Sequence, residues 1–247
     1  MQNNRTVIFT DLDGSLLNHG DYSFLEALPM LEKIKKEHID LIFTTSKTKK
    51  ECELLQEKMG IEAPFIVENG ACIYYDDDSF ELLGRPHKEI VSFIDKYKVR
   101  FGIRAFKDSS IEDIAHATGF SHQQAKLAKQ RLFSEPFLIE DEKSIEVLKS
   151  IAKTEGFKIL KGGRFYHCVG AGQDKGMAVR RALKCYEGYR SIALGDNFND
   201  IAMLESVDIP ILIPRFKGDY IPLDLPNLIK APYKGSLGWN EALKQVL

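Results

Sequence analysis

The sequence predicts an α/β fold built on a mainly parallel sheet, with a smaller α+β domain inserted into it. Three observations predict this class. Short β-branched runs alternate with helical patterns toward both ends of the chain, the alternation changes in the middle, and acidic residues follow the strands of the outer segments. With 247 residues, 44% of them hydrophobic, the chain can form one large domain or two modest ones.

The first segment alternates between strands and helices. Buried strands are expected at three short apolar runs: Thr6–Thr10, Ile39–Thr45 and Pro64–Val67. Ser23 is expected to cap a helix that runs through Ile34, with Glu26 completing a capping box. Thr48 is expected to begin a second helix, which Gly60 ends. These elements predict the first half of an open sheet with helices between its strands.

The pattern changes after a predicted hairpin, 72–75 with 80–83, whose acidic turn we expect to be solvated. Helices are mixed with short strands beyond it. The expected elements are helices at 87–99, within 110–131 and near 144–154, and strands at 137–139, 157–160 and 165–169. The first pattern then resumes. It continues with a helix from 175, a strand at 191–194, a helix near 198–206, a strand at 209–213 and a last helix at 239–246. We therefore predict a core at 1–83 and 172–247, with a cap domain at 84–171.

Charge is divided between these parts. Residues 84–171 hold 16 Lys and Arg against 11 Asp and Glu, a net charge of +5, whereas the remainder carries −7 and the whole chain −2. This near balance argues against a nucleic-acid partner bound by bulk attraction to phosphate.

No apolar run approaches the roughly 18 residues of a membrane span, and residues 1–5 lead directly into a strand. We expect a cytoplasmic protein with no membrane partner. The four isolated cysteines predict neither a disulfide framework nor a zinc site.

The first acidic signal is DLDGS at 11–15, directly after the first strand. Ligands of open α/β sheets bind at the carboxyl ends of the strands, so Asp11 and Asp13 are expected to face a ligand. Two carboxylates so close together repel each other unless a cation lies between them. Because carboxylate oxygens suit Mg²⁺, which also binds phosphate, these residues indicate a magnesium-assisted site.

Three further segments bring matching chemistry to core elements: TTSK at 44–47, QDKG at 173–176 and GDNFND at 195–200. They supply hydroxyl donors, an ammonium at a helix start, and further acids and amides at a strand end. A carboxylate nucleophile, a charge-neutralising lysine and a second acid form a set of groups suited to phosphoryl transfer.

The chain resembles the haloacid dehalogenase superfamily of phosphatases, whose four motifs are matched in order by DLDGS, TTS, DKG and GDNFND. This resemblance implies a Rossmann-like core. The insert between the second and third motifs is similar to the C2 cap of one subgroup. Within this superfamily the chain most resembles the mannosyl-3-phosphoglycerate phosphatases, through the segments FTDLDGSLL, TSKT, PFIVENGA, SEPF and GGRFYH. The chain departs from that pattern at Ser15, where threonine is usual, and at Leu132-Phe133, where an acidic residue is expected before the aromatic one.

The resemblance implies a role for each motif. Asp11 is the implied nucleophile, and Asp13 the general acid for the leaving group and then the general base for water. Thr45 is expected to hydrogen-bond the phosphoryl group, with Ser46 as the alternative. Lys175 is expected to neutralise phosphate charge and to hold the nucleophile.

The implied cofactor is Mg²⁺. Its expected ligands are Asp11, the backbone carbonyl of Asp13 and Asp196, with Asp200 in support. Asn199 is expected to orient the metal shell or the substrate. The histidines outside the GGRFYH motif show no metal-ligand spacing.

Four residues are further candidates for contact with a substrate. Arg164 is expected to bind a glycerate carboxylate or the sugar, because a guanidinium can donate two parallel hydrogen bonds to the two oxygens of a carboxylate. His167 is a second candidate, or a structural histidine. Asn69 either contacts the active site or simply forms a turn, and Lys47 reaches either substrate or solvent.

Together these features predict a Mg²⁺-dependent phosphatase that converts mannosyl-3-phosphoglycerate, a phosphorylated sugar, into mannosylglycerate and phosphate through an aspartyl-phosphate. Alternatives are a glucosyl-3-phosphoglycerate phosphatase, another sugar-phosphate phosphatase and a mutase resembling phosphomannomutases. A non-catalytic ligand sensor on the same scaffold is a further alternative. Cap closure is expected about hinges near Gly84 and 170–172.

Overall fold

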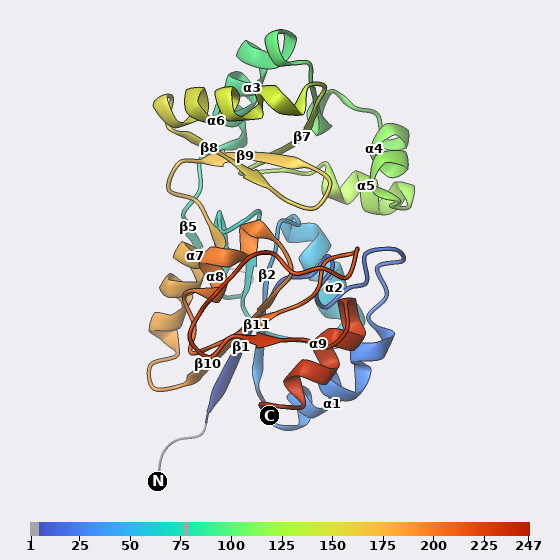
Figure 1. Cartoon of the computed structure of the whole chain (residues 1–247), viewed down its shortest axis with the longest axis vertical. Coiled ribbons are helices and arrows are strands. Elements are labelled where there is room, and N and C mark those ends of the chain that lie inside the picture. The colour runs from blue at the N-terminus through green and yellow to red at the C-terminus, as the bar shows by residue number, and fades with distance from the viewer. Residues whose placement is uncertain (1–4, 77–78) are drawn as a thin grey trace.

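The computed structural model describes residues 5–76 and 79–247, which are organised around two sheets (Figure 1). The larger sheet contains eight strands within the described residues. They are β1 (Thr6–Thr10), β2 (Asp40–Thr44), β3 (Phe65–Val67), β4 (Cys72–Tyr74), β5 (Phe80–Leu82), β10 (Arg190–Gly195), β11 (Ile209–Leu212) and β12 (Ile229–Lys230). Their order is β12-β11-β10-β1-β2-β3-β4-β5, parallel as far as β3 and antiparallel in the last two pairings. This confirms the predicted, mainly parallel sheet.

Helices cover both faces of this sheet. The helices of one face are α1 (Leu28–Lys36), α2 (Lys49–Met59) and α9 (Gly235–Leu243), and those of the other are α7 (Lys175–Ala182) and α8 (Ile201–Leu204). Side chains along β1 alternate between the two layers, because successive residues of a strand point to opposite faces. Ile8 packs with Trp239 in the first layer, whereas Val7 and Phe9 pack in the second. We call these elements the core.

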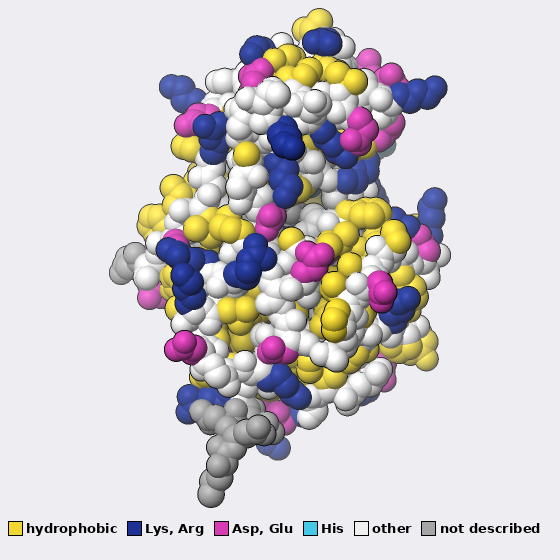
Figure 2. Space-filling view, turned by 60° about the vertical axis from the view of Figure 1, so that its left-hand side comes forward, with side chains coloured by type: hydrophobic (Ala, Val, Ile, Leu, Met, Phe, Trp, Pro, Cys, Tyr) yellow, Lys and Arg dark blue, Asp and Glu magenta, His cyan; other side chains and the backbone are white. Residues whose placement is uncertain are grey.

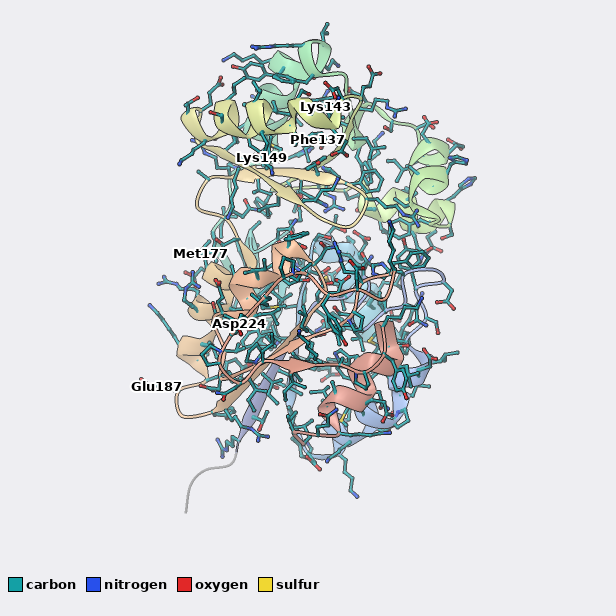
Figure 3. All side chains as sticks on the ribbon, in the orientation of Figure 1. Phe137, Lys143, Lys149, Met177, Glu187 and Asp224 are labelled. Atoms are coloured by element: carbon teal, nitrogen blue, oxygen red, sulfur yellow. The ribbon has the colours of Figure 1, made fainter. Side chains whose placement is uncertain are left out.

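A second, antiparallel sheet carries the strands that lie between β5 and α7 in the chain. The elements here are α3 (His87–Phe101), β6 (Ile103–Ala105), α4 (Ile111–Thr118), α5 (His122–Ala128), β7 (Glu135–Ile139), α6 (Ile145–Thr154), β8 (Phe157–Lys161) and β9 (Tyr166–Gly170). The strand order is β6-β7-β9-β8, and α3 and α6 pack on one face around the fully buried Phe137. Figure 3 labels Phe137 in this upper part and Met177 in the core below it. We call these elements the cap.

Two helix starts differ from the prediction. Helix α1 follows a 3₁₀ turn, Leu25–Ala27, and neither start has a side-chain cap, so the expected capping box is wrong. The Glu26 carboxylate instead accepts a hydrogen bond from Ser236 at 2.8 Å. That contact brings in α9, which begins at Gly235 rather than at 239. A Cβ at Gly238 would lie 1.6 Å from the carbonyl oxygen of Tyr233, so close packing requires the glycine there.

Most other predicted elements are present, among them the helix capped by Thr48 and the hairpin of β4 and β5. Strands β6 and β12 were not predicted, and the helix near 198–206 is a 3₁₀ turn, Phe198–Asp200, followed by the short α8. Residues 77 and 78 of the acidic turn lie outside the described residues. The exact boundaries at 83/84 and 171/172 stay a prediction. Within 5–76 and 79–247, every helix is too short or too polar to cross a membrane.

Candidate active site

Three carboxylates meet at the carboxyl end of the large sheet. Asp11 follows β1 and Asp196 follows β10, the strand beside it, while Asp200 ends the 3₁₀ turn that follows. All three are buried, and one oxygen of each lies within 4.8 Å of the others. Parallel neighbouring strands end at the same edge, which is why residues 185 positions apart in the chain come together.

Lys175 links two of these acids. It is the first residue of α7 and is fully buried, with Nζ 2.5 Å from Asp11 Oδ1 and 2.6 Å from Asp200 Oδ1. Burial alone would lower the pKa of Lys175, but the charges of Asp11 and Asp200 raise it above its usual value. The amine is therefore held as an ammonium. The structure thus brings together the predicted nucleophile and the predicted lysine.

The acid cluster fits a divalent cation. Burial and then the charge of Asp200 raise the pKa of Asp11 well above its usual value, although Lys175 opposes the rise. Burial also raises the pKa of Asp196 to about 6. When all three carboxyls are ionised, they and the Lys175 ammonium carry a net charge of −2, which an ion of charge +2 would balance. The donors are hard oxygens, the type that Mg²⁺ prefers. Asp11, Asp196 and Asp200 are the residues that could hold such an ion.

His19 is a site residue that the sequence analysis missed. Its Nε2 lies 3.1 Å from Asp196 Oδ2. Gly14 makes this approach possible, because it adopts φ +95° and a Cβ there would lie 2.3 Å from that ring nitrogen. The opposite side of the site is fixed by Asp200, whose Oδ2 accepts the amides of Asp196 and Asn197, both at 3.0 Å. A single sequence holds no spacing signal for His19, since folding alone brings it to Asp196.

Asp13 is paired with Lys47. The Lys47 ammonium lies 2.9 Å from Asp13 Oδ1 and 3.6 Å from Glu51 Oε1. Only 5% of Lys47 is exposed, so it does not reach solvent. Burial would lower its pKa, but Asp13 and Glu51 raise it above the usual value. Its Nζ also lies 5.4 Å from the ring centre of Tyr22 in the core and 4.9 Å from that of Phe120 in the cap.

The two hydroxyls of the second motif occupy different places. Thr45 is fully buried, and its Oγ1 accepts the amide of Lys47 at 3.1 Å. Ser46 is the one that lines the cavity beside Asp11 and Asp13. Its carbonyl oxygen accepts a hydrogen bond from the guanidinium of Arg131 in the cap. Of the two predicted phosphoryl contacts, Ser46 therefore faces the open space.

A cavity of about 130 Å³ lies between the carboxylates, which line it, and the cap. Its roof includes Arg164, which also donates to the carbonyl of Ala117 at 2.9 Å, and His167 on β9. Burial, then the charges of Arg131 and Lys175, lower the pKa of His167 to about 3, so its ring is neutral. Its Nδ1 is buried without a hydrogen-bond partner among the described residues. The space-filling view shows a waist between the two parts, with Lys and Arg side chains gathered above it (Figure 2).

Asn199 and Asn69 form a pair at the edge of the site. Asn199 lines the cavity, and its Nδ2 donates to Asn69 Oδ1 at 3.1 Å. Asn69 itself is fully buried in the β3–β4 turn, with φ +60°. Asn69 therefore forms the turn that was one of its two predicted roles. It contacts Asn199, which lines the cavity, and does not line the cavity itself.

Such an arrangement defines an enzyme that works on anionic esters: a buried carboxylate held by an ammonium, a second acid two residues on, and a covered cavity. The chain belongs to the haloacid dehalogenase-like hydrolase family, whose model matches residues 8–214. It is a phosphoric monoester hydrolase, as the sequence predicted.

The comparisons extend over almost the whole chain. A glucosyl-3-phosphoglycerate/mannosyl-3-phosphoglycerate phosphatase of Persephonella marina is 52% identical over 260 residues, covering 98% of this chain and 97% of its own. A mannosyl-3-phosphoglycerate phosphatase of Pyrococcus furiosus is 33% identical over 224 residues, covering 84% and 90%. A solved structure from Thermoplasma acidophilum superposes with a TM-score of 0.75 at 17% identity, over 98% of both chains. That last likeness shows the fold.

Proposed function

We propose that this enzyme is a Mg²⁺-dependent phosphatase of glycosyl-3-phosphoglycerates, acting on the mannosyl and the glucosyl ester. The observation that carries the proposal is Lys175 fixing Asp11 beneath a covered cavity with cap residues in its roof. The substrate class comes from the relatives, since the Persephonella protein is named for both esters and is 52% identical.

In the first step, a carboxylate oxygen of Asp11 attacks phosphorus, and the bond from phosphorus to the glycerate oxygen breaks. Asp13 donates its proton to that departing oxygen, which leaves an aspartyl-phosphate on Asp11 and an ionised Asp13. Asp13 then takes a proton from a water molecule that attacks phosphorus. Phosphate leaves, and both residues return to their starting states.

The geometry suits these roles. The Asp11 side chain is 9% exposed and that of Asp13 33%, so the nucleophile is sheltered while the acid can exchange protons with a leaving group. Lys175 neutralises charge near the transferring oxygens. A Mg²⁺ ion held by Asp11 and Asp196, with Asp200 and the carbonyl of Asp13 in support, would supply electrostatic stabilisation of the phosphoryl oxygens.

Recognition of the remaining ester is assigned to the roof and walls. Arg164 offers a guanidinium to a glycerate carboxylate, and the buried, unpaired Nδ1 of the neutral His167 offers a hydrogen-bond partner to a hydroxyl. Ser46, rather than the buried Thr45, contacts the phosphoryl group. Lys47 lines the same cavity, and without a bound ester its ammonium pairs with Asp13.

We also propose that the chain is divided into a core at 1–83 and 172–247 and a cap at 84–171 that moves about its two connections. The distribution of strands between the two sheets supports this division.

Phosphate release tests the proposal. The purified enzyme with Mg²⁺ is expected to release phosphate from both glycosyl-3-phosphoglycerates and to stop when EDTA is added. Asp11→Ala is expected to abolish turnover, whereas Asp224→Ala, which alters an exposed acid in the lower part of Figure 3, keeps the unaltered rate. If Asp11→Ala turned over at nearly the rate of the unaltered enzyme, Asp11 would be excluded as the nucleophile. An isomerised phosphosugar without free phosphate would instead identify a mutase.

A further inference from the structure

A buried carboxylate of the core holds a segment of the cap. The Glu68 side chain is reached by three donors from residues just before β7. Leu132 N lies at 2.9 Å, Phe133 N at 3.0 Å and Ser134 Oγ at 2.6 Å from its oxygens. Glu68 is 1% exposed and Ser134 is fully buried. We call residues 131–134 the strap.

The buried Glu68 carboxylate is satisfied by these donors. Among the described residues, no lysine, arginine or histidine forms an ion pair with it. A carboxylate has enough lone pairs for three donors, and hydrogen bonds to an ionised group are stronger than neutral ones. The strap therefore supplies the stabilisation that this buried anion needs, and a displaced strap would leave the charge to be rehydrated.

The Glu68 backbone is strained where it makes this contact. Glu68 and Asn69 adopt φ +48° and +60°, a region that side-chain-bearing residues enter only at a cost in backbone strain. Neighbouring loops hold the strained turn in place. The amides of Glu68 and Asn69 donate to the carbonyls of Lys47 and Thr45, and Gln173 Nε2 donates to the Glu68 carbonyl at 2.7 Å.

The same turn thus contacts the second-motif loop, the connection before α7 and the strap. Additional contacts tie the strap to the core. Arg131 donates to the Ser46 carbonyl, Gln173 Nε2 lies 3.3 Å from the Phe133 carbonyl, and the Phe133 ring packs against the apolar cluster of the core.

The strap leads directly into the cavity roof. Strand β7 begins one residue after Ser134, and its Pro136 lines the cavity and pairs with His167 on β9. A shift of the strap therefore moves roof residues relative to the carboxylates below. The carboxylates and Lys175 come from β1, α7 and the loop after β10, so they do not follow the strap in this way, whereas the Ser46 loop is tied to the strap through Arg131.

We propose that Glu68 is a positioning residue that seats the strap on the core and thereby sets the place of the roof over Asp11. The proposal rests on the proposed function, since only an ester larger than phosphate reaches the roof. Glu68 touches neither the reacting atoms nor the cavity, so its effect falls on binding of the sugar portion rather than on phosphoryl transfer.

The test separates these two effects. The KM is measured for the phosphorylated sugar ester that the unaltered enzyme hydrolyses with the lowest KM, and the competitive Ki for inorganic phosphate, which needs the core alone. Glu68→Gln keeps the shape but turns an amide N–H₂ toward at least one strap donor. We expect KM to rise about 10-fold, the effect of losing one charge-assisted hydrogen bond, with Ki changed less than about 2-fold.

Two further variants make the result specific. Ser134→Ala removes one donor from the strap side and is expected to raise KM in the same direction, with the double variant no worse than Glu68→Gln alone. Glu135→Gln is the matched control. Glu135 is also 1% exposed, but its partners, His87 at 2.6 Å and the Lys107 amide at 2.8 Å, lie within the cap. Its ratio of KM to Ki is expected to stay that of the unaltered enzyme.

An unchanged KM in both Glu68→Gln and Ser134→Ala, or a parallel rise of KM and Ki, would overturn the proposal. If Glu68→Gln does not fold, Ser134→Ala decides by the same criterion. If the ester with the lowest KM is not a glycosyl-3-phosphoglycerate, the proposed function is wrong. The changes in KM and Ki caused by Glu68→Gln are then measured with that ester and still test the role of Glu68.

Discussion

Acid is expected to destabilise this protein through His167, a residue of the cavity roof. The side chain is 7% exposed and lies among cationic groups, with Arg131 and Lys175 acting on it from the strap and from α7. Burial, then these two charges, lower its pKa to about 3, whereas an unfolded chain has a histidine pKa of about 6.5. The folded protein therefore binds fewer protons here than the unfolded chain.

The sign and size follow from that difference. Because the folded pKa is the lower one, the contribution to stability is complete above about pH 6.5 and is lost as pH falls toward 3. Each pH unit in that window costs about 1.36 kcal/mol, so the loss from this site is about 2 kcal/mol at pH 5 and about 4 kcal/mol at pH 3.

The assay compares the unaltered protein with His167→Gln, which is neutral at every pH. Free energies of unfolding are measured by urea titration at pH 7 and pH 5, with EDTA present so that a bound cation does not contribute. The unaltered protein is expected to lose about 2 kcal/mol more than the variant between the two pH values. His122→Gln, at an exposed position on α5, is the matched control and keeps the full loss. Equal losses in the unaltered protein and His167→Gln would refute the argument.

Two further outcomes concern the carboxylates and their lysine. Asp13→Asn keeps the shape of the acid but cannot transfer a proton, so kcat in steady-state assays is expected to fall about 10²–10⁴-fold; a fall below about 10-fold would exclude it as the acid. Lys175→Met leaves buried acids without their ammonium, and we expect loss of turnover and about 3–5 kcal/mol lower stability in urea titrations. Unchanged stability would show that the pairs to Asp11 and Asp200 contribute nothing net.

Much of the fold could be predicted because its signals are local. The run Thr6–Thr10 is apolar on both faces, and the strand is buried in the sheet. Thr48 and Glu51 stand three residues apart, and they form the capping box that such spacing permits. Ser23 and Glu26 have the same spacing, but Glu26 is drawn to Ser236 on α9, a tertiary contact that overrides the local preference.

The site was predictable as far as its motifs follow strands. Asp11 and Asp196 meet because the sheet order, which the sequence analysis did not predict, places β1 beside β10, and Lys175 joins them from the start of α7. His19 and Glu68 could not be predicted in this way. Each acts on a partner more than 60 positions away, and its role depends on how two loops pack rather than on any repeated spacing.

The two lysines of the site give the two acids of one short motif different surroundings, as the roles proposed for them require. Lys175 reaches Asp11 from within the core, and both remain enclosed, so the setting of the proposed nucleophile does not depend on the cap. Lys47 reaches the more exposed Asp13, and its ammonium also faces the ring of Phe120 in the cap. A cap movement would therefore change the surroundings of Asp13, the proposed general acid and base, while Asp11, the proposed nucleophile, stays fixed.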